Sequence, residues 1–326
     1  MKHGIGSMDH DHDHDHDHDT QSTISLAGSG AAVRPIGLSP ALRKRDNEDW
    51  YRGSKWPPIG LDPRAAIAAP KTFPRAYWSS YHFSFTVLAE FVTTKSADGL
   101  TWNSKDVRNA LEHELKSADV KAELDELAEL IEYRSGVMAE ALAQRENPWA
   151  YYRALFMGDA WSTPYTRDLL EIALRVGQFA AMHYKREFNR PRPSQYSPGL
   201  LPPIDVPGHA SFPSGHATEA YLISACLAQV MPVADRAVPL PDTSPLQQMA
   251  QRIARNREVL GVHYPSDSRA GKVLAETLFK ILMECPTIKG KRDGKTPEEQ
   301  AGLLANAREE WWDGPERGSN KKTPQS

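Results

Sequence analysis

Gly208-His209-Ala210-Ser211-Phe212-Pro213-Ser214-Gly215-His216-Ala217 leads into an apolar run from Ala220 to Met231. The run predicts a helix, with Pro213-Ser214-Gly215 as its N-terminal approach. A helix start leaves backbone N–H groups unpaired and carries a partial positive charge, and glycine lets a ligand come close. A tetrahedral oxyanion therefore fits here, with Ser214 donating a hydroxyl and His216 placed for proton transfer. Because serine before a helix is also a common N-cap, the flanking segments must decide.

A basic cluster precedes this stretch. Thr163-Pro164 predicts the N-cap and first-turn proline of a helix that ends in His183-Tyr184-Lys185-Arg186-Glu187-Phe188-Asn189-Arg190-Pro191-Arg192-Pro193. Two prolines in this cluster forbid further helix. We therefore expect Lys185 in the last helical turn, and Arg190 and Arg192 on an extended segment just beyond it. Without its neighbours, the cluster would be explained as a solvated helix end that complements the helix dipole.

A histidine and a carboxylate follow the next predicted helix. The sequence from Asn256 to Asp267 is Asn-Arg-Glu-Val-Leu-Gly-Val-His-Tyr-Pro-Ser-Asp. Pro265 interrupts the helix, and Asp267 lies four residues past His263. This spacing lets a carboxylate orient an imidazole, fix its tautomer and raise its basicity. The alternative for His263 is a core histidine whose ring nitrogens are satisfied.

The three stretches share the residue types that bind and attack a multiply charged oxyanion. Cations, a hydroxyl and helix-start amides neutralise such an anion, and two histidines can supply a nucleophile or ligand and a general acid–base. A helical module that only captures phosphate would not need both imidazoles. Carboxylate-rich metal cages and Cys-x-x-Cys pairs are missing from the sequence, which disfavours a metal-cation hydrolase. The residues are Lys185, Arg192, Ser214, Gly215, His216, Arg257, His263 and Asp267.

These stretches resemble the signature of the type 2 phosphatidic acid phosphatase and vanadium-dependent haloperoxidase superfamily: Lys-x6-Arg-Pro, Pro-Ser-Gly-His and Ser-Arg-x5-His-x3-Asp. Residues 185–193 match the first part and residues 213–216 the second. Residues 257–267 match the third, in which Asn256 replaces the serine as a helix-side hydrogen bonder. The N-terminal half has no such match and carries no functional inference. The resemblance implies an all-α helical bundle that holds phosphate or vanadate.

The resemblance also implies a role for each residue. In a phosphatase, His263 would attack phosphorus and form a phosphohistidine, Asp267 would orient it, and His216 would protonate the leaving group. In a haloperoxidase, His263 would instead be the axial metal ligand to vanadium, and His216 would assist peroxide binding and cleavage. In both, the residues expected to bind the oxyanion are Lys185, Arg192, Ser214, Gly215, Arg257 and His263.

Two features favour a vanadate-dependent haloperoxidase that oxidises bromide or iodide with hydrogen peroxide. His209 lies five residues before Ser214, where bromide-oxidising members are similar in carrying a second histidine, and a long helical segment precedes the signature. For His209, a role in tuning peroxide or halide and a plain loop histidine are equally open. Against this choice, residues 261–267 look like the lipid-phosphatase version of the third part, and the chain is short for a haloperoxidase. The alternative is a soluble acid phosphatase that acts on phosphate monoesters.

Composition limits the partners. The 326 residues carry a formal net charge of −3, which suggests no nucleic-acid partner. No apolar run approaches the roughly 20 residues that span a bilayer, so we expect a soluble protein, either cytoplasmic or exported. The expected partners are hydrogen peroxide, halide or a phosphate ester; vanadate is the expected cofactor, phosphate can take its place, and NAD, flavin and haem are not expected. A homo-oligomer stays open. Cys226 and Cys285 read as buried thiols rather than a disulfide.

The sequence divides into four parts. Residues 1–33, with their Asp-His repeat, form a tail or tag, and residues 34–100 an irregular N-terminal arm and a first helix. Residues 101–290 form the helical-bundle catalytic domain, and residues 291–326 a C-terminal helix and tail. Ala76 to Thr93 is helix or strand, and Ser104 should cap the next helix. An apolar stripe from Leu124 to Leu142 indicates further helix, and Thr296 should open a helix that ends near Trp311.

Overall fold

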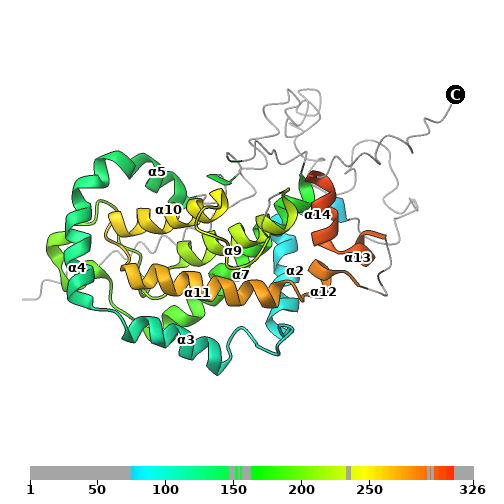
Figure 1. Ribbon diagram of the computed structural model, residues 1–326, viewed down its shortest axis with the longest axis horizontal. Helices are drawn as coiled ribbons and strands as arrows, with labels where there is room; N and C mark the ends of the chain where they lie inside the picture. The colour runs from blue at the N-terminus through cyan, green and yellow to red at the C-terminus, as the bar shows by residue number, and fades with distance from the viewer. Residues whose placement is uncertain are drawn as a thin grey trace, which may run out of the picture. The chain divides into compact units, whose positions relative to one another are not determined.

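The computed structural model describes residues 75–146, 151–152, 155, 163–232, 236–291, 294 and 297–311. The chain forms two compact units, Met1–Tyr77 and Trp78–Ser326. Of the first unit, only the short 3-10 helix η1 (Arg75–Tyr77) is described. The predicted arm and the Asp-His repeat lie outside the described residues, and the division of the sequence into four parts stays a prediction. In the second unit every described regular element is helical (Figure 1), which confirms the all-α fold.

The second unit runs through the following described elements: α2 (Ser80–Thr93), α3 (Lys105–Lys116), α4 (Val120–Glu129), η2 (Leu130–Tyr133), α5 (Arg134–Glu146), α7 (Pro164–Phe188), α8 (Pro193–Tyr196), η3 (Pro198–Leu200), α9 (Gly215–Val230), α10 (Pro245–Val259), α11 (Pro265–Leu282), α12 (Pro286–Lys289), α13 (Pro297–Ala301) and α14 (Leu303–Trp311).

The helix starts follow local chemistry. Ser104 caps α3 as expected, because its side chain accepts a hydrogen bond from the backbone of Val107. Proline occupies the first position of α7, α10 and α11, where no N–H is needed. Thr163 sits before α7 but makes no side-chain cap bond. Instead, the Glu310 carboxylate of α14 accepts hydrogen bonds from the N–H groups of Tyr165 (2.6 Å) and Thr166 (2.8 Å).

Helix α9 is the centre of the second unit. It packs against α7, α10 and α11, and Figure 1 shows α10 and α11 running on either side of it. Its residues from Ala217 to Val230 are almost all buried, which explains why the run is apolar on every face. Gly271 of α11 permits the close approach to α9, because a Cβ there would lie 2.7 Å from the Cβ of Ala217 and 2.9 Å from the carbonyl oxygen of Ser214.

Several boundaries differ from the sequence prediction. The segment from Ala76 to Thr93 is helical from Ser80. The stripe from Leu124 to Leu142 is divided between α4, η2 and α5, because a 3-10 turn redirects the chain at residues 130–133. The C-terminal helix is divided into α13 and α14 at Gly302, whose φ of 81° is unfavourable for other residues. Pro265 begins α11 as well as following the end of α10.

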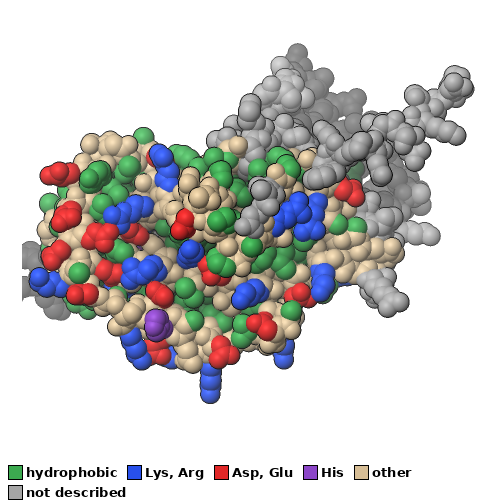
Figure 2. Space-filling model, in the orientation of Figure 1, with side chains coloured by type: hydrophobic (Ala, Val, Ile, Leu, Met, Phe, Trp, Pro, Cys, Tyr) green, Lys and Arg blue, Asp and Glu red, His purple; other side chains and the backbone are tan. Residues whose placement is uncertain are grey.

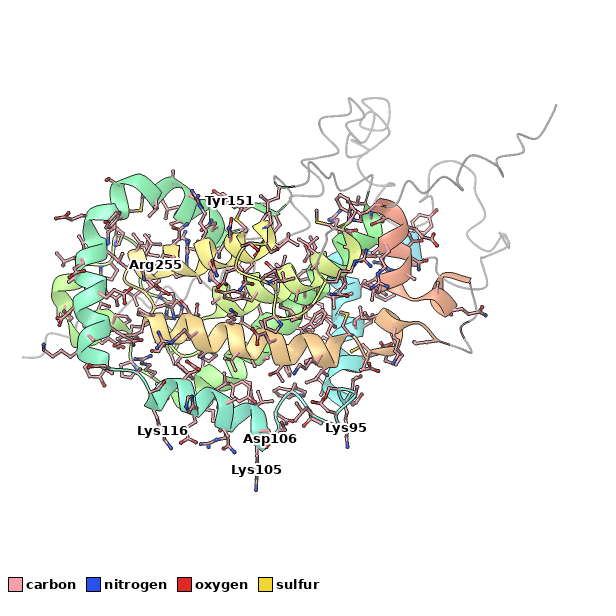
Figure 3. All side chains as sticks on the ribbon, in the orientation of Figure 1. Lys95, Lys105, Asp106, Lys116, Tyr151 and Arg255 are labelled. Carbon is pink, nitrogen blue, oxygen red and sulfur yellow. The ribbon has the colours of Figure 1, made fainter. Side chains whose placement is uncertain are left out.

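The two cysteines are buried and free, as expected. Among the described residues, no helix has both the length and the apolar character needed to cross a bilayer. On the described part of the face in Figure 2, basic and acidic side chains are interspersed. Figure 3 shows that Lys105, Asp106 and Lys116 of α3 project from the lower edge of the second unit in this view.

Candidate active site

Lys185 joins the basic cluster to the loop before α9. It lies in the last turn of α7, as predicted, and is buried. Its Nζ donates hydrogen bonds to the carbonyl oxygens of Ala210 (2.8 Å) and Ser211 (2.9 Å). Burial and the nearby charge of Arg192 lower the pKa of Lys185 to about 7, against the opposing effects of two carboxylates. A buried ammonium at this position can bind an anion, and its charge is sensitive to its neighbours.

Arg192 connects the loop before α9 with the segment between α10 and α11. It lies on extended backbone before α8, with ψ of 154°. Its Nε donates to the carbonyl of His209 (3.0 Å), and Nη1 donates to the carbonyl of Val262 (2.7 Å). Nη1 also lies 3.1 Å from Nε2 of His263, and Nη2 lies 3.0 Å from Nδ1 of His209. The side chain of His209 is exposed, which places it at the rim of the site, and its ring accepts a hydrogen bond from Arg192.

The tautomer of His263 follows from its two partners. Nδ1 lies 3.1 Å from Oδ2 of Asp267, which is an acceptor, and Nε2 faces the donor Nη1 of Arg192. The proton is therefore on Nδ1 and the lone pair on Nε2. Burial, then the charge of Arg192, lowers the pKa of His263 well below its usual value, so the ring is neutral at neutral pH. This is the form that a nucleophile or metal ligand requires.

Asp267 is fixed by donors on both oxygens. Oδ2 also accepts hydrogen bonds from the Ser211 hydroxyl and from the Tyr264 N–H (3.0 Å). Oδ1 accepts one from Nη1 of Arg190 at 2.7 Å. Burial opposes the ionised form, but the bond with His263 and the charges around it lower the pKa of Asp267 to about 2. Asp267 is the third residue of α11, where a carboxylate is also favoured by the helix dipole.

The start of α9 lies against this pair. The N–H of Ser214 donates to the backbone carbonyl of Asp267 at 3.0 Å. The Ser214 hydroxyl accepts a bond from Ala217 N–H (3.3 Å), so the plain N-cap interpretation is correct as well. A Cβ at Gly215 would lie 3.9 Å from Cε of Lys185, which brings this helix start beside the ammonium. The N-terminal end of α9 therefore lies next to Lys185 of the basic cluster.

His216 and Arg257 carry buried polar atoms that have no partner within the described residues, Nε2 of the first and Nε of the second. Nη2 of Arg257 donates to the carbonyl of Ala141 on α5. Burial, followed by the charge of Arg257, lowers the pKa of His216 to about 3, and burial lowers the pKa of Arg257 to about 10. Buried polar atoms are rarely left without a partner, so these two fit an oxyanion ligand.

All nine predicted site residues are thus in one network of contacts and charges, and four participants were missed. Arg190 and Ser211 hold Asp267 and lie inside the quoted stretches, so their proximity was the available signal. Glu219 is buried one turn after Gly215, and burial raises its pKa to about 7. Glu123 of α4 contacts Arg190 from the N-terminal half, where no motif indicated it.

Asn256 is a helix-side hydrogen bonder as expected, because its Nδ2 donates to Oε1 of Gln144 on α5 at 2.8 Å.

Comparisons with known proteins identify the family of this chain. Residues 169–291 match the model of the PAP2 superfamily. The chain is 34% identical over 144 residues to the decaprenylphosphoryl-5-phosphoribose phosphatase of Mycolicibacterium smegmatis, which covers 42% of this chain and 73% of that protein. It is 34% identical over 107 residues to the protein of the same name from Mycobacterium tuberculosis, covering 33% of this chain and 54% of that one. The chain belongs to the PAP2 superfamily.

The relatives change the balance between the two expected chemistries. Both are named as phosphatases, and this similarity supports the phosphatase alternative better than the haloperoxidase that the sequence favours. Glu123 lies outside the residues that match the family model.

Proposed function

We propose that this chain is a phosphatase that cleaves phosphate monoesters through a phosphohistidine on His263. One observation carries the proposal: Asp267 holds the proton on Nδ1, so the lone pair of Nε2 faces the guanidinium of Arg192. A nucleophile oriented by a carboxylate and facing an anion-binding cation has the arrangement that attack on phosphorus requires. The similarity to named phosphatases supports this chemistry.

In the first step, Nε2 of His263 attacks phosphorus and the ester P–O bond breaks. The leaving oxygen takes a proton from His216. The phosphoryl oxygens are bound by Lys185, Arg192 and Arg257 together with the helix-start amides, and positioned charge of this kind does most of the work in phosphoryl transfer. In the imidazolium that forms at His263, the proton stays on Nδ1 and remains hydrogen-bonded to the Asp267 carboxylate.

In the second step, a water molecule attacks the phosphohistidine, His216 takes its proton, and the P–N bond breaks to release phosphate. His216 must be protonated before the first step, whereas burial and then Arg257 lower its pKa to about 3 in the free protein. A bound dianion beside the ring raises that pKa, because an opposite charge favours the imidazolium. The substrate therefore supplies the charge that prepares its own general acid.

The relatives' names suggest which ester to test first. Both refer to a phosphate on a ribose that is linked to a polyprenyl phosphate. We propose a lipid-linked sugar phosphate as the substrate class of this chain. The exposed side chain of His209, hydrogen-bonded to Arg192, brings one edge of the proposed phosphate site to the protein surface.

A second candidate is the vanadate-dependent haloperoxidase. The observation in its favour is the hydrogen bond between Arg192 and His209, which places a second imidazole at the rim of the oxyanion site. The two orphaned nitrogens of His216 and Arg257 fit vanadate as they fit phosphate. When bound, vanadate would supply activation of peroxide for halide oxidation, held by residues Lys185, Arg192, Ser214, Gly215, Arg257 and His263.

Two assays on the same preparation separate the candidates. We expect hydrolysis of p-nitrophenyl phosphate that orthovanadate inhibits, and an acid-labile, base-stable phosphoenzyme that disappears in His263→Asn. Bromination of a dye with hydrogen peroxide and added vanadate is the competing readout. Halogenation without ester hydrolysis would overturn the phosphatase proposal, and a phosphoenzyme that persists in His263→Asn would remove the role of His263.

A further inference from the structure

A buried carboxylate from the N-terminal half contacts the residues behind the nucleophile. Glu123 of α4 is only 6% exposed. We propose that Glu123 is a positioning residue, which holds Arg190 and Ser266 so that Asp267 keeps His263 in the geometry for attack. This role rests on the proposed function. It assigns a part in the site to a helix that precedes the matched residues 169–291.

Both carboxylate oxygens of Glu123 are used. Oε1 accepts a hydrogen bond from the N–H of Ser266 at 2.7 Å and lies 3.3 Å from Nη2 of Arg269. Oε2 accepts one from the Ser266 hydroxyl at 2.7 Å and one from Nη2 of Arg190 at 3.3 Å. Ser266 is the second residue of α11, so Glu123 satisfies an N–H that the helix leaves unpaired. A side chain from α4 therefore fixes the start of the helix that carries Asp267.

Arg190 links this carboxylate to Asp267. Its Nη1 donates to Oδ1 of Asp267 and to the hydroxyl of Ser266, each at 2.7 Å. Its guanidinium lies over the ring of Tyr264, 3.7 Å from the centroid. Because Glu123 binds Nη2 and the Tyr264 ring fixes the plane of the guanidinium, Nη1 is directed toward Ser266 and Oδ1 of Asp267. Oδ2 of Asp267 is then turned toward His263, Ser211 and the N–H of Tyr264.

The charges explain why a second carboxylate is useful. Arg190 is buried, and among the described residues it forms ion pairs with Asp267 (2.7 Å) and Glu123 (3.3 Å). With Glu123 neutralised, the full charge of Arg190 would act on Asp267 alone, and the surroundings of His263 would become more positive. A more positive surrounding lowers the pKa of an imidazole and weakens the stabilisation of the imidazolium that forms during attack. Glu123 thus supports the reaction without touching the substrate.

Glu123→Gln tests this role, with Glu126→Gln as the matched control. Glu126 lies on the same helix and pairs at 2.5 Å with Arg255 of α10, which Figure 3 labels, and both side chains are exposed by more than 40%. For Glu123→Gln we expect kcat on p-nitrophenyl phosphate to fall about tenfold, the lower end of the effect known for partners that orient a metal-ligating histidine. KM should change little, and the acid limb of the pH profile of kcat/KM should move to lower pH. The control should match the wild type.

A second readout does not depend on activity. The ¹⁵N chemical shifts of the His263 imidazole report whether the proton stays on Nδ1, and we expect them to move toward a tautomer mixture in Glu123→Gln only. If Glu123→Gln does not fold, Ser266→Ala breaks the hydroxyl bridge between the two charged residues and should give the same shift change with several-fold lower kcat.

The outcomes separate the two proposals. If the wild type hydrolyses no phosphate ester, the proposed function fails, but the imidazole shifts still test the positioning. If Glu123→Gln, or Ser266→Ala in its place, keeps the wild-type kcat, pH profile and shifts, Glu123 has only a structural role and the inference is overturned.

Discussion

Nη1 of Arg192 lies 3.1 Å from Nε2 of His263, so the cation proposed to bind phosphoryl oxygens also holds the lone pair proposed to attack phosphorus. The same guanidinium stays anchored through the carbonyls of His209 and Val262. A phosphoryl oxygen that accepts from Nη1 would release the lone pair as the substrate binds. In this arrangement the nucleophile becomes available only when the anion is in place.

His263→Asn should abolish turnover while the site remains assembled. The substitution removes the attacking nitrogen but leaves the buried pair of Asp267 and Arg190 (2.7 Å), so we expect the protein to stay folded. By comparison with triads in which one member is lost, kcat should fall on the order of 10³-fold or more. Calorimetric titration with inorganic phosphate should still show binding, and residual turnover within tenfold of the wild type would contradict the assignment.

Gly271→Ala should destabilise the protein at the contact between α9 and α11. The new Cβ would lie 2.7 Å from the Cβ of Ala217 and 2.9 Å from the carbonyl oxygen of Ser214. Overpacking of this kind costs about 1–3 kcal/mol, and it should also lower activity because it displaces the start of α9. Gly136→Ala in α5 is the control, since nothing lies within 4 Å of its added Cβ, and it should raise stability by about 0.5–1 kcal/mol. Urea unfolding of the two variants measures the difference.

Glu219→Gln should change the pH dependence of substrate binding. Burial raises the pKa of Glu219 to about 7, and its charge opposes the burial that lowers the pKa of Lys185 to about 7. Without that charge Lys185 loses its proton at lower pH, so the alkaline limb of kcat/KM should move to lower pH. The stability of the variant relative to the wild type should rise between pH 4.5 and pH 7 and stay higher above pH 7, because the buried carboxylate that is costly to ionise is gone. An unchanged alkaline limb would mean that the charge of Glu219 does not affect the pKa of Lys185.

Acid should destabilise the protein partly through His216. Its pKa is lowered to about 3 in the folded state by burial and then Arg257, so between pH 6.5 and 3 the unfolded chain binds a proton that the folded chain does not. Stability from this group is therefore present above pH 6.5 and is lost as pH falls, by at most about 1.4 kcal/mol per pH unit. The melting temperature of His216→Gln should fall less than that of the wild type between pH 7 and pH 4. Parallel curves would show that folding does not lower the pKa of His216.

Much of the candidate site could be predicted from the local rules of helix structure. The i, i+4 spacing of His263 and Asp267 places them within hydrogen-bond distance at a helix start, and Lys185 falls in the last turn of α7 because prolines follow. These relationships depend on a few consecutive residues. The apolar period, in contrast, cannot detect the 3-10 turn at residues 130–133, since a 3-10 turn and an α-helix present similar stripes over one turn.

The amino-acid order therefore fixed which residues could act on an oxyanion and which helix ends carry them, because capping, proline breaks and i, i+4 contacts are local. The packing of α4 and α5 onto α10 and α11 decided the rest. It brings Glu123 to Arg190 and the carbonyl of Ala141 to Arg257, across separations of 67 and 116 residues. A buried charge selects whichever partner the folded chain places beside it, and contacts between such distant segments have no period or motif that a sequence displays.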